Sequence, residues 1–132
     1  MALTTALTLQ EDGTDAIRDD GDCAVRCSAV AAVYPVIACN IVTPSRLQYF
    51  DWFPLSTRIM DWFVLNYAPL RKQQQDWRLN LLDASPSLLK RLPQTHLLIA
   101  TEDPLRDEGR EFEALLQSLG VDVTATTFDM KH

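Results

Sequence analysis

The spacing of apolar residues changes along the chain, and each spacing predicts a different kind of element. In residues 1–12, alanines and leucines recur mostly at i and i+4, which predicts a helix with one apolar side. Residues 11–27 are polar and predict a loop, the segment least expected to be ordered. Residues 28–37 are apolar without alternation, which is typical of a strand buried on both faces of a parallel sheet. Pro35 is expected to end the pairing of this strand.

Aromatic residues crowd the next segment, residues 44–71. Ser56 is suited to cap a helix over residues 57–67, and Pro69 is expected to stop it. The apolar residues of this helix that share one stripe are Ile59, Met60, Phe63, Val64 and Tyr67. The aromatic side chains of the segment either pack as ordinary core or line a pocket, and their spacing does not choose between these two interpretations.

The last third of the chain has the clearest pattern. Residues 72–92 predict only short helical turns and loops, whereas residues 95–100 are apolar enough for a buried strand. Residues 107–119 carry phenylalanine and leucine at helical spacing, and Gly120 suits the position just after the helix. Residues 121–128 alternate and are rich in β-branched side chains, which predicts another strand. Strand, helix and strand together form a βαβ unit with parallel strands.

Composition removes several classes of function. The 12 basic and 18 acidic residues give a formal net charge of −6, and basic residues never occur in a run that would suit a nucleic-acid groove. No apolar stretch approaches the roughly 18 residues of a membrane span, so no stable membrane anchor is expected. Cys23 and Cys27 lack a second pair of ligands, so neither a metal nor another cofactor is expected. An odd number of cysteines fits reduced thiols in the cytoplasm.

The four glycines are too widely spaced for three well-known motifs. None is close enough to another to form a G-x-S-x-G nucleophile elbow, a phosphate-binding loop or a dinucleotide fingerprint; they are Gly13, Gly21, Gly109 and Gly120. The serines of the chain lie in predicted strands, helices and caps, and none is expected to replace the elbow serine as a nucleophile.

Two residues that could act together in catalysis follow the two strands of the βαβ unit. Asp103 comes after the first strand and His132 after the second, so both are expected at the same edge of the sheet. An aspartate beside a histidine can orient the imidazole and stabilise its protonated form, which is how a triad base works. Taken alone, however, Asp103 is also a common turn residue and His132 a common tail residue. The acids Asp107 and Glu108 are explained by their favourable position at a helix N-terminus.

Several segments of the chain together resemble successive parts of one known protein family. The most specific match is LIATEDPLRDEG at residues 98–109, which resembles the strand and acid turn of that family. The others follow in the family's order: AAVYPV at 31–36, MDWFVLNY at 60–67, ASPSLL at 84–89, GVDV at 120–123 and FDMKH at 128–132. The family that these segments resemble is the fold-3 group of the α/β-hydrolases, the esterases similar to hormone-sensitive lipase, and the similarity covers most of the chain.

The resemblance implies a partial α/β-hydrolase fold, with a mostly parallel sheet of about three strands and flanking helices. It implies one domain over residues 1–132, with a lid-like helical insert at residues 44–71 and the βαβ unit at residues 94–132. Asp103 matches the triad acid and His132 matches the triad base. The family's serine elbow and glycine-rich oxyanion motif have no counterpart here. The chain therefore resembles the C-terminal part of a carboxylic ester hydrolase that is expected to be inactive alone.

Two further expectations concern partners. A small-molecule carboxylic ester is the substrate that the resemblance implies for the complete enzyme, while the chain by itself is an uncertain enzyme. The alternative is a non-catalytic remnant or a partner-binding α/β module. A parallel sheet is normally covered on both faces and at its edges, so an uncovered apolar edge predicts self-association or binding of a chain that supplies the missing part.

Overall fold

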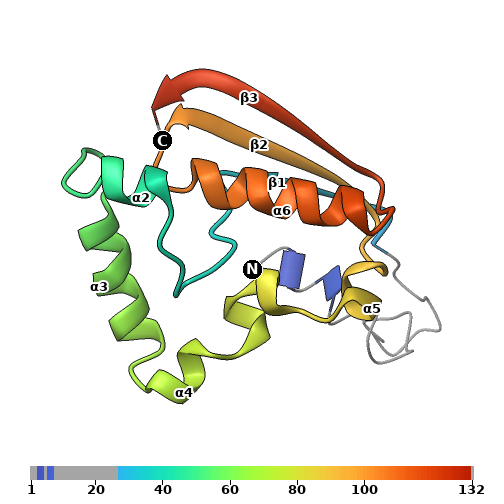
Figure 1. The fold of residues 1–132 in the computed structure, drawn as a ribbon, viewed down its shortest axis with the longest axis horizontal. Coiled ribbons are helices and arrows are strands. Elements are labelled where there is room, and N and C mark those ends of the chain that lie inside the picture. Colours follow the sequence, from blue (N-terminus) through green and yellow to red (C-terminus); the bar gives the residue numbers. More distant parts are fainter. Residues whose placement is uncertain (1–2, 5, 8–26, 132) are drawn as a thin grey trace, which may run out of the picture.

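The computed structural model describes residues 3, 4, 6, 7 and 27–131 (Figure 1). The four described N-terminal residues are helical, in agreement with the prediction for residues 1–12. The rest of that helix, nearly all of the loop predicted over residues 11–27, and His132 lie outside the described residues.

Three parallel strands form one sheet in the order β1-β2-β3, where β1 spans Ala29–Val33, β2 spans Gln94–Glu102 and β3 spans Val123–Lys131. Parallel neighbours need a crossover, and helix α6 (Arg106–Ser118) makes the one from β2 to β3. Figure 1 shows α6 lying along the two strands that it connects. The predicted α/β class and the parallel βαβ unit are confirmed.

Strand β1 is buried on one face only, so the prediction of burial on both faces is wrong. Val30 and Ala32 are buried, whereas Ala29, Ala31 and Val33 are exposed. The physical reason is that, within the described residues, the core lies on one side of this strand and no second layer covers the other. The prediction for Pro35 is confirmed, because β1 ends two residues before it.

Four helices and two 3-10 turns make up half of the chain between β1 and β2. They are α2 (Pro44–Gln48), α3 (Thr57–Tyr67), α4 (Arg71–Gln74) and α5 (Pro86–Leu89), with 3-10 turns at Trp77–Leu79 and Leu81–Asp83. The hydroxyl of Ser56 accepts a hydrogen bond from the backbone N–H of Ile59 at 3.3 Å and caps α3 as predicted. The helix ends at Tyr67, two residues before Pro69.

The apolar stripe of α3 is mostly exposed. Met60 is its only buried residue, while Trp62, Phe63 and Tyr67 on the same helix are 59%, 55% and 68% exposed. The ordinary-core interpretation of these aromatic side chains is therefore wrong for this chain, although Tyr49, which precedes α3, is buried.

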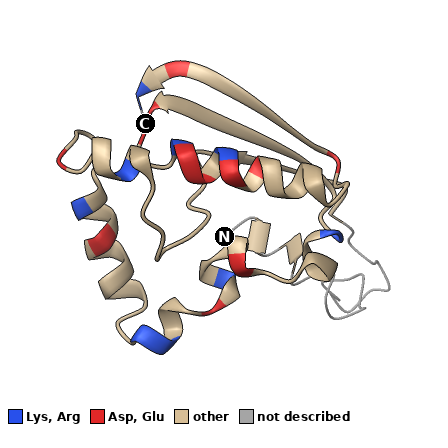
Figure 2. Ribbon diagram, viewed as in Figure 1, with Lys and Arg blue, Asp and Glu red and all other residues tan. Residues whose placement is uncertain are grey.

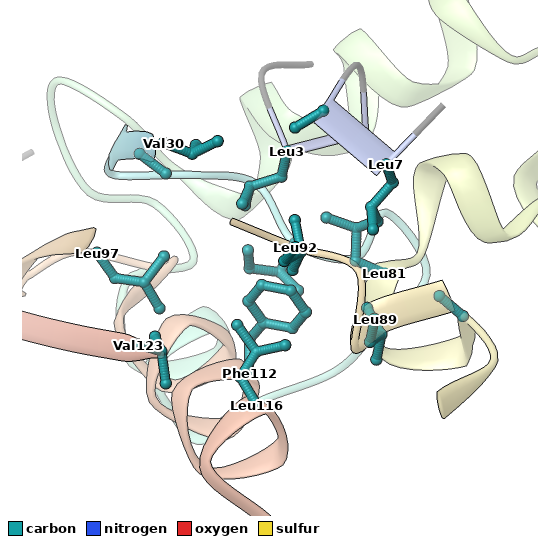
Figure 3. Close-up of a cluster of buried hydrophobic side chains, with 14 of the residues drawn as sticks. Leu3, Leu7, Val30, Leu81, Leu89, Leu92, Leu97, Phe112, Leu116 and Val123 are labelled. Carbon is teal, nitrogen blue, oxygen red and sulfur yellow. The ribbon is translucent and has the colours of Figure 1, made fainter. Parts of the chain in front are cut away.

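The hydrophobic core lies between the sheet and the helices (Figure 3). Phe112 and Leu116 of α6 are fully buried beside Leu97 of β2. Leu3 and Leu7 reach the same cluster from the N-terminal helical residues, which closes the core from the other side. The inward positions predicted for the residue 107–119 helix are confirmed, with two leucines only partly buried. Gly120 follows the helix with φ 75°, the left-handed conformation that favours glycine.

Candidate active site

The turn that carries Asp103, here called the acid turn, comprises residues 101–105, from the last two residues of β2 to the residue before α6. Asp103 directly follows the last residue of β2 and is 1% exposed. Its carboxylate Oδ1 accepts a hydrogen bond from the backbone N–H of Leu105 at 2.8 Å, and its carbonyl accepts one from Arg106 N at 3.2 Å. Asp103 is thus held at the carboxyl end of the middle strand, where open α/β sheets keep their sites.

The second predicted site residue, His132, lies outside the described residues, so its contact with Asp103 stays a prediction. Strand β3 is described to Lys131, and the sheet register pairs this residue with Glu102 after an irregularity near Ala100. Lys131 Nζ lies 4.0 Å from Glu102 Oε2. The residues that immediately precede Asp103 and His132 are therefore neighbours across the sheet.

Helix α2 contacts the acid turn through Ser45. The Ser45 hydroxyl donates to the carbonyl of Pro104 at 2.8 Å and accepts from the backbone N–H of Asp107 at 3.2 Å. The backbone N–H of Ser45 donates to Asp107 Oδ2 at 2.7 Å. Ser45 is fully buried, as is its bond to Pro104, whereas its two bonds to the partly exposed Asp107 are partly buried. Three hydrogen bonds thus join one residue of α2 to the residues on either side of the start of α6.

A buried ion pair makes the second connection between α2 and α6. Arg46 and Glu108 are 3% and 0% exposed, and Arg46 Nε and Nη2 lie 2.8 and 2.6 Å from Glu108 Oε2. Glu108 Oε1 accepts the backbone N–H of Ile37 at 2.8 Å, and Arg46 Nη2 donates to the carbonyl of Ala38 at 2.6 Å. Figure 2 shows the charged turns at the start of α6 close to α2. The pair therefore ties three separate segments together.

The sequence explained Asp107 and Glu108 only by their position at a helix N-terminus. In the structure both carboxylates also have specific partners that change their pKa. Burial raises the pKa of Glu108, and the charge of Arg46 and the N–H of Ile37 oppose that rise. Partial burial also opposes ionisation of Asp107, but hydrogen bonds from Arg106 and Ser45 outweigh it and lower its pKa. No sequence signal pairs Arg46 with Glu108, because the two residues are 62 positions apart.

The remaining polar groups near the sheet have structural partners. His96 on β2 contacts the hydroxyls of Thr124 and Thr126 through Nδ1 and Nε2, at 2.5 and 3.1 Å. In the described part of the chain, no group of three or more His, Cys, Asp or Glu side chains is placed to hold a metal ion. Within the same residues, no helix combines the length and apolar composition needed to cross a membrane.

A shallow groove of about 290 Å³ lies beside α2, on the side of α3. Cys39, Leu47 and Phe50 contribute to its lining, and Asp61 of α3 borders it. Arg46 is the one residue that contributes both to this groove and to the ion pair with Glu108. The groove does not include Asp103.

The parallel sheet and the buried Asp103 after its middle strand place this chain among the α/β proteins. Proteins of this class have their sites at the carboxyl ends of the strands. The alpha/beta hydrolase fold family matches residues 1–132. The chain belongs to this family, in its fold-3 group, as the segments around Asp103 indicate.

Known esterases are among the proteins similar to this chain. An esterase of Gibberella moniliformis is 32% identical over 91 residues, which are 68% of this chain and 29% of that protein. The structure of a thermostable esterase from Pseudomonas putida has a TM-score of 0.82 and 31% identity, and the match covers 95% of this chain and 36% of that one. An esterase of Rhizomucor miehei has a TM-score of 0.82, 27% identity and coverages of 96% and 36%. The chain thus spans about a third of the length of these relatives.

Proposed function

We propose that this chain is the C-terminal part of a carboxylic ester hydrolase similar to hormone-sensitive lipase. In this proposal Asp103 is the acid and His132 the base of a Ser-His-Asp triad. The observation that carries the proposal is the pairing of Glu102 with Lys131, because it brings the backbone next to Asp103 beside the backbone next to His132. The buried position of Asp103 after the middle strand supports it.

In the proposed reaction, His132 takes the proton of a serine hydroxyl and later returns it to the leaving alcohol, while Asp103 keeps the imidazole in the required tautomer. The serine and the oxyanion donors come from outside residues 1–132. Without a triad serine, kcat falls by about 10⁶-fold in a known serine hydrolase, so this chain alone is expected to show no measurable turnover. The insert at residues 44–71 is proposed to act as part of a lid over the ester.

A chimera tests the proposal. Residues 1–132 replace the segment on which they superpose in the Pseudomonas putida esterase, and hydrolysis of a short p-nitrophenyl ester is followed. We expect activity in the chimera, a loss of about 10⁴-fold in kcat for Asp103→Asn and a larger loss for His132→Gln. The matched controls are Asp122→Asn, at the other end of β3, and His96→Gln on β2, and both should stay close to the unmodified chimera.

A second measurement does not depend on the chimera. An NMR titration of the 132-residue chain should show His132 gaining its proton at higher pH in the unmodified chain than in Asp103→Asn, because a neighbouring carboxylate favours the imidazolium. Equal titration curves would show that the two residues do not form a catalytic pair. The same conclusion would follow if the Asp103→Asn and His132→Gln chimeras retained more than a tenth of the activity.

The exposed side of the sheet favours a second candidate function, binding of a partner chain. Strand β1 pairs only with β2 among the described residues, and its outer face presents Ala29, Ala31 and the 55% exposed Val33. We propose that this edge associates with another chain, either a second copy or one that supplies the missing part of the fold. A monomer in sedimentation up to high concentration, together with a sharply cooperative thermal melt, would contradict association through this edge. The cytoplasmic location stays a prediction.

A further inference from the structure

The geometry around α2 points to a role for two residues that lie outside the proposed triad. We propose that Arg46 and Glu108 are positioning residues, which act through helix α2 to hold the acid turn and thereby the carboxylate of Asp103. This inference rests on the proposed function, because the position of Asp103 matters for catalysis only if Asp103 is the triad acid.

The first step of the argument is how Glu108 is held. Its Oε2 faces both Nε and Nη2 of Arg46, and its Oε1 accepts the backbone N–H of Ile37 at 2.8 Å. Arg46 in turn donates to the carbonyl of Ala38 at 2.6 Å. Arginine presents these donors in a rigid planar fork, so the pair fixes the orientation of α2 relative to α6 and not only the distance between them.

The second step is the connection from α2 to the acid turn itself. Ser45, the neighbour of Arg46, donates to the carbonyl of Pro104 at 2.8 Å, one residue after Asp103. On the other side of Asp103, the carbonyl of Thr101 accepts hydrogen bonds from Tyr49 Oη at 3.4 Å and from Arg106 at 3.1 Å. Ser45 in the first turn of α2 and Tyr49 just after its last residue therefore hold the backbone on both sides of Asp103.

The third step is why a buried ion pair serves this purpose. Replacing such pairs by well-packed apolar residues is often neutral or stabilising, so their stability contribution alone does not explain them, whereas they can specify one arrangement among several. The position of a catalytic group is demanding, since a displacement of about 1 Å can cost about 10²-fold in rate. Asp103 lies on a turn and not within a strand. The Arg46–Glu108 pair limits the movement of that turn by joining α6 to α2, which lies outside the βαβ unit.

The experiment measures amide hydrogen exchange in the 132-residue chain, in the peptide that covers residues 101–105. The variants are Glu108→Gln, which removes the charge, and Arg46→Lys, which keeps the charge but removes the fork. The matched control is Glu113→Gln, the same change at a partly exposed position of α6, where the carboxylate accepts a hydrogen bond from Gln117 of the same helix. A second control, Phe112→Leu, lowers stability from the core without touching α2, and mild denaturant brings the variants to equal overall stability.

We expect exchange in the acid turn to be at least tenfold faster in Glu108→Gln and in Arg46→Lys than in Phe112→Leu at equal stability. Glu113→Gln should match the unmodified chain. Equal exchange rates in the acid turn of the ion-pair variants and of Phe112→Leu would overturn the proposal, because the pair would then contribute only to overall stability. If Glu108→Gln does not fold, Arg46→Lys decides the question alone.

Kinetics in the chimeric esterase supply the catalytic readout. Arg46→Lys should lower kcat by at least tenfold and change KM by a smaller factor, because the buried Arg46 side chain acts on the acid turn. A loss no greater than that of Phe112→Leu would count against positioning. An inactive unmodified chimera would refute the proposed function instead, and the exchange measurement would still decide whether Arg46 and Glu108 hold the acid turn.

Discussion

Asn80 offers a sharp test of how the segments that precede α2 and follow α4 are held together. It is fully buried, and its side-chain oxygen accepts the backbone N–H of Cys39 at 2.9 Å and of Asn40 at 3.3 Å. Its side-chain nitrogen donates to the carbonyls of Gln74 at 2.5 Å and Asp76 at 3.4 Å. One amide therefore joins the loop after β1 to the turn after α4.

The loss of stability on removing this amide depends on which hydrogen bonds remain to each of its four backbone partners. In Asn80→Ala, the N–H of Cys39 keeps its 3.0 Å hydrogen bond to Leu79 O, and the carbonyl of Asp76 keeps its 2.9 Å bond from Leu79 N. The exposed Asn40 can bond to water. The carbonyl of Gln74 is partly buried and loses its short hydrogen bond, and one such group costs about 1–3 kcal/mol. We therefore expect the free energy of unfolding to fall by about 2 kcal/mol.

Equilibrium unfolding in urea measures this loss. The matched control is Asn66→Ala on the exposed face of α3, where the side chain donates only to Trp62 O within its own helix, and it should change stability by less than about 0.5 kcal/mol. Asn80→Asp should be less stable at neutral pH than at acidic pH, because burial raises the pKa of the new carboxyl in the folded state. A loss below about 0.5 kcal/mol in Asn80→Ala, or an equal loss in Asn66→Ala, would refute the reasoning.

Three other predictions follow from single contacts. Phe112→Ala, at a fully buried position, should lower the free energy of unfolding by about 3–5 kcal/mol in urea, and a change below about 1 kcal/mol would mean that the core lies elsewhere. Gly120→Ala, at φ 75°, should lower the free energy of unfolding by about 1–2 kcal/mol in the same assay, whereas no loss would mean that the turn after α6 relaxes. Hydrogen bonds from Arg78 lower the pKa of Asp76 from 3.8 to about 2, so the stability from this exposed pair is complete above pH 3.8 and is lost as the pH falls toward 2. An NMR titration of Asp76 checks this, and a midpoint near 3.8 would contradict it.

The elements that could be predicted are those set by local pattern. The helix over residues 107–119 carries its apolar residues at a helical spacing and has glycine at its end, and α6 forms within one residue of that range. Likewise, Ser56 caps α3 because its hydroxyl can reach an N–H three residues ahead. These features depend on neighbours in the chain, so the sequence is sufficient to predict them.

The errors concern burial, which depends on what lies across space. The run of apolar residues in β1 suggested cover on both faces, yet Ala31 and Val33 are exposed within the described structure. The aromatic residues of α3 could equally have been core, yet Trp62 and Tyr67 point into solvent. An apolar pattern shows that a surface can be buried. The segment itself does not show whether another layer of the fold covers that surface.

Only part of the candidate site could be found from the sequence. The position of Asp103 after the middle strand follows from the βαβ topology, whereas its proposed role as the triad acid comes from a resemblance. The contacts of Arg46 with Glu108 and of Ser45 with Pro104 left no sequence signal, because they join segments 62 and 59 positions apart. Buried polar groups must find partners, but the sequence does not say which residue supplies them.

The sequence by itself determined the order of strands and helices, the family, and the placement of Asp103 at a strand end, because hydrophobic spacing, caps and turns act between residues close in the chain. Tertiary structure alone decided that α2 contacts the acid turn, that Glu108 is an ion-pair partner and not merely a helix-end acid, and that one face of β1 is exposed. These outcomes depend on which distant groups exclude water from one another, and that is settled only when the chain is folded.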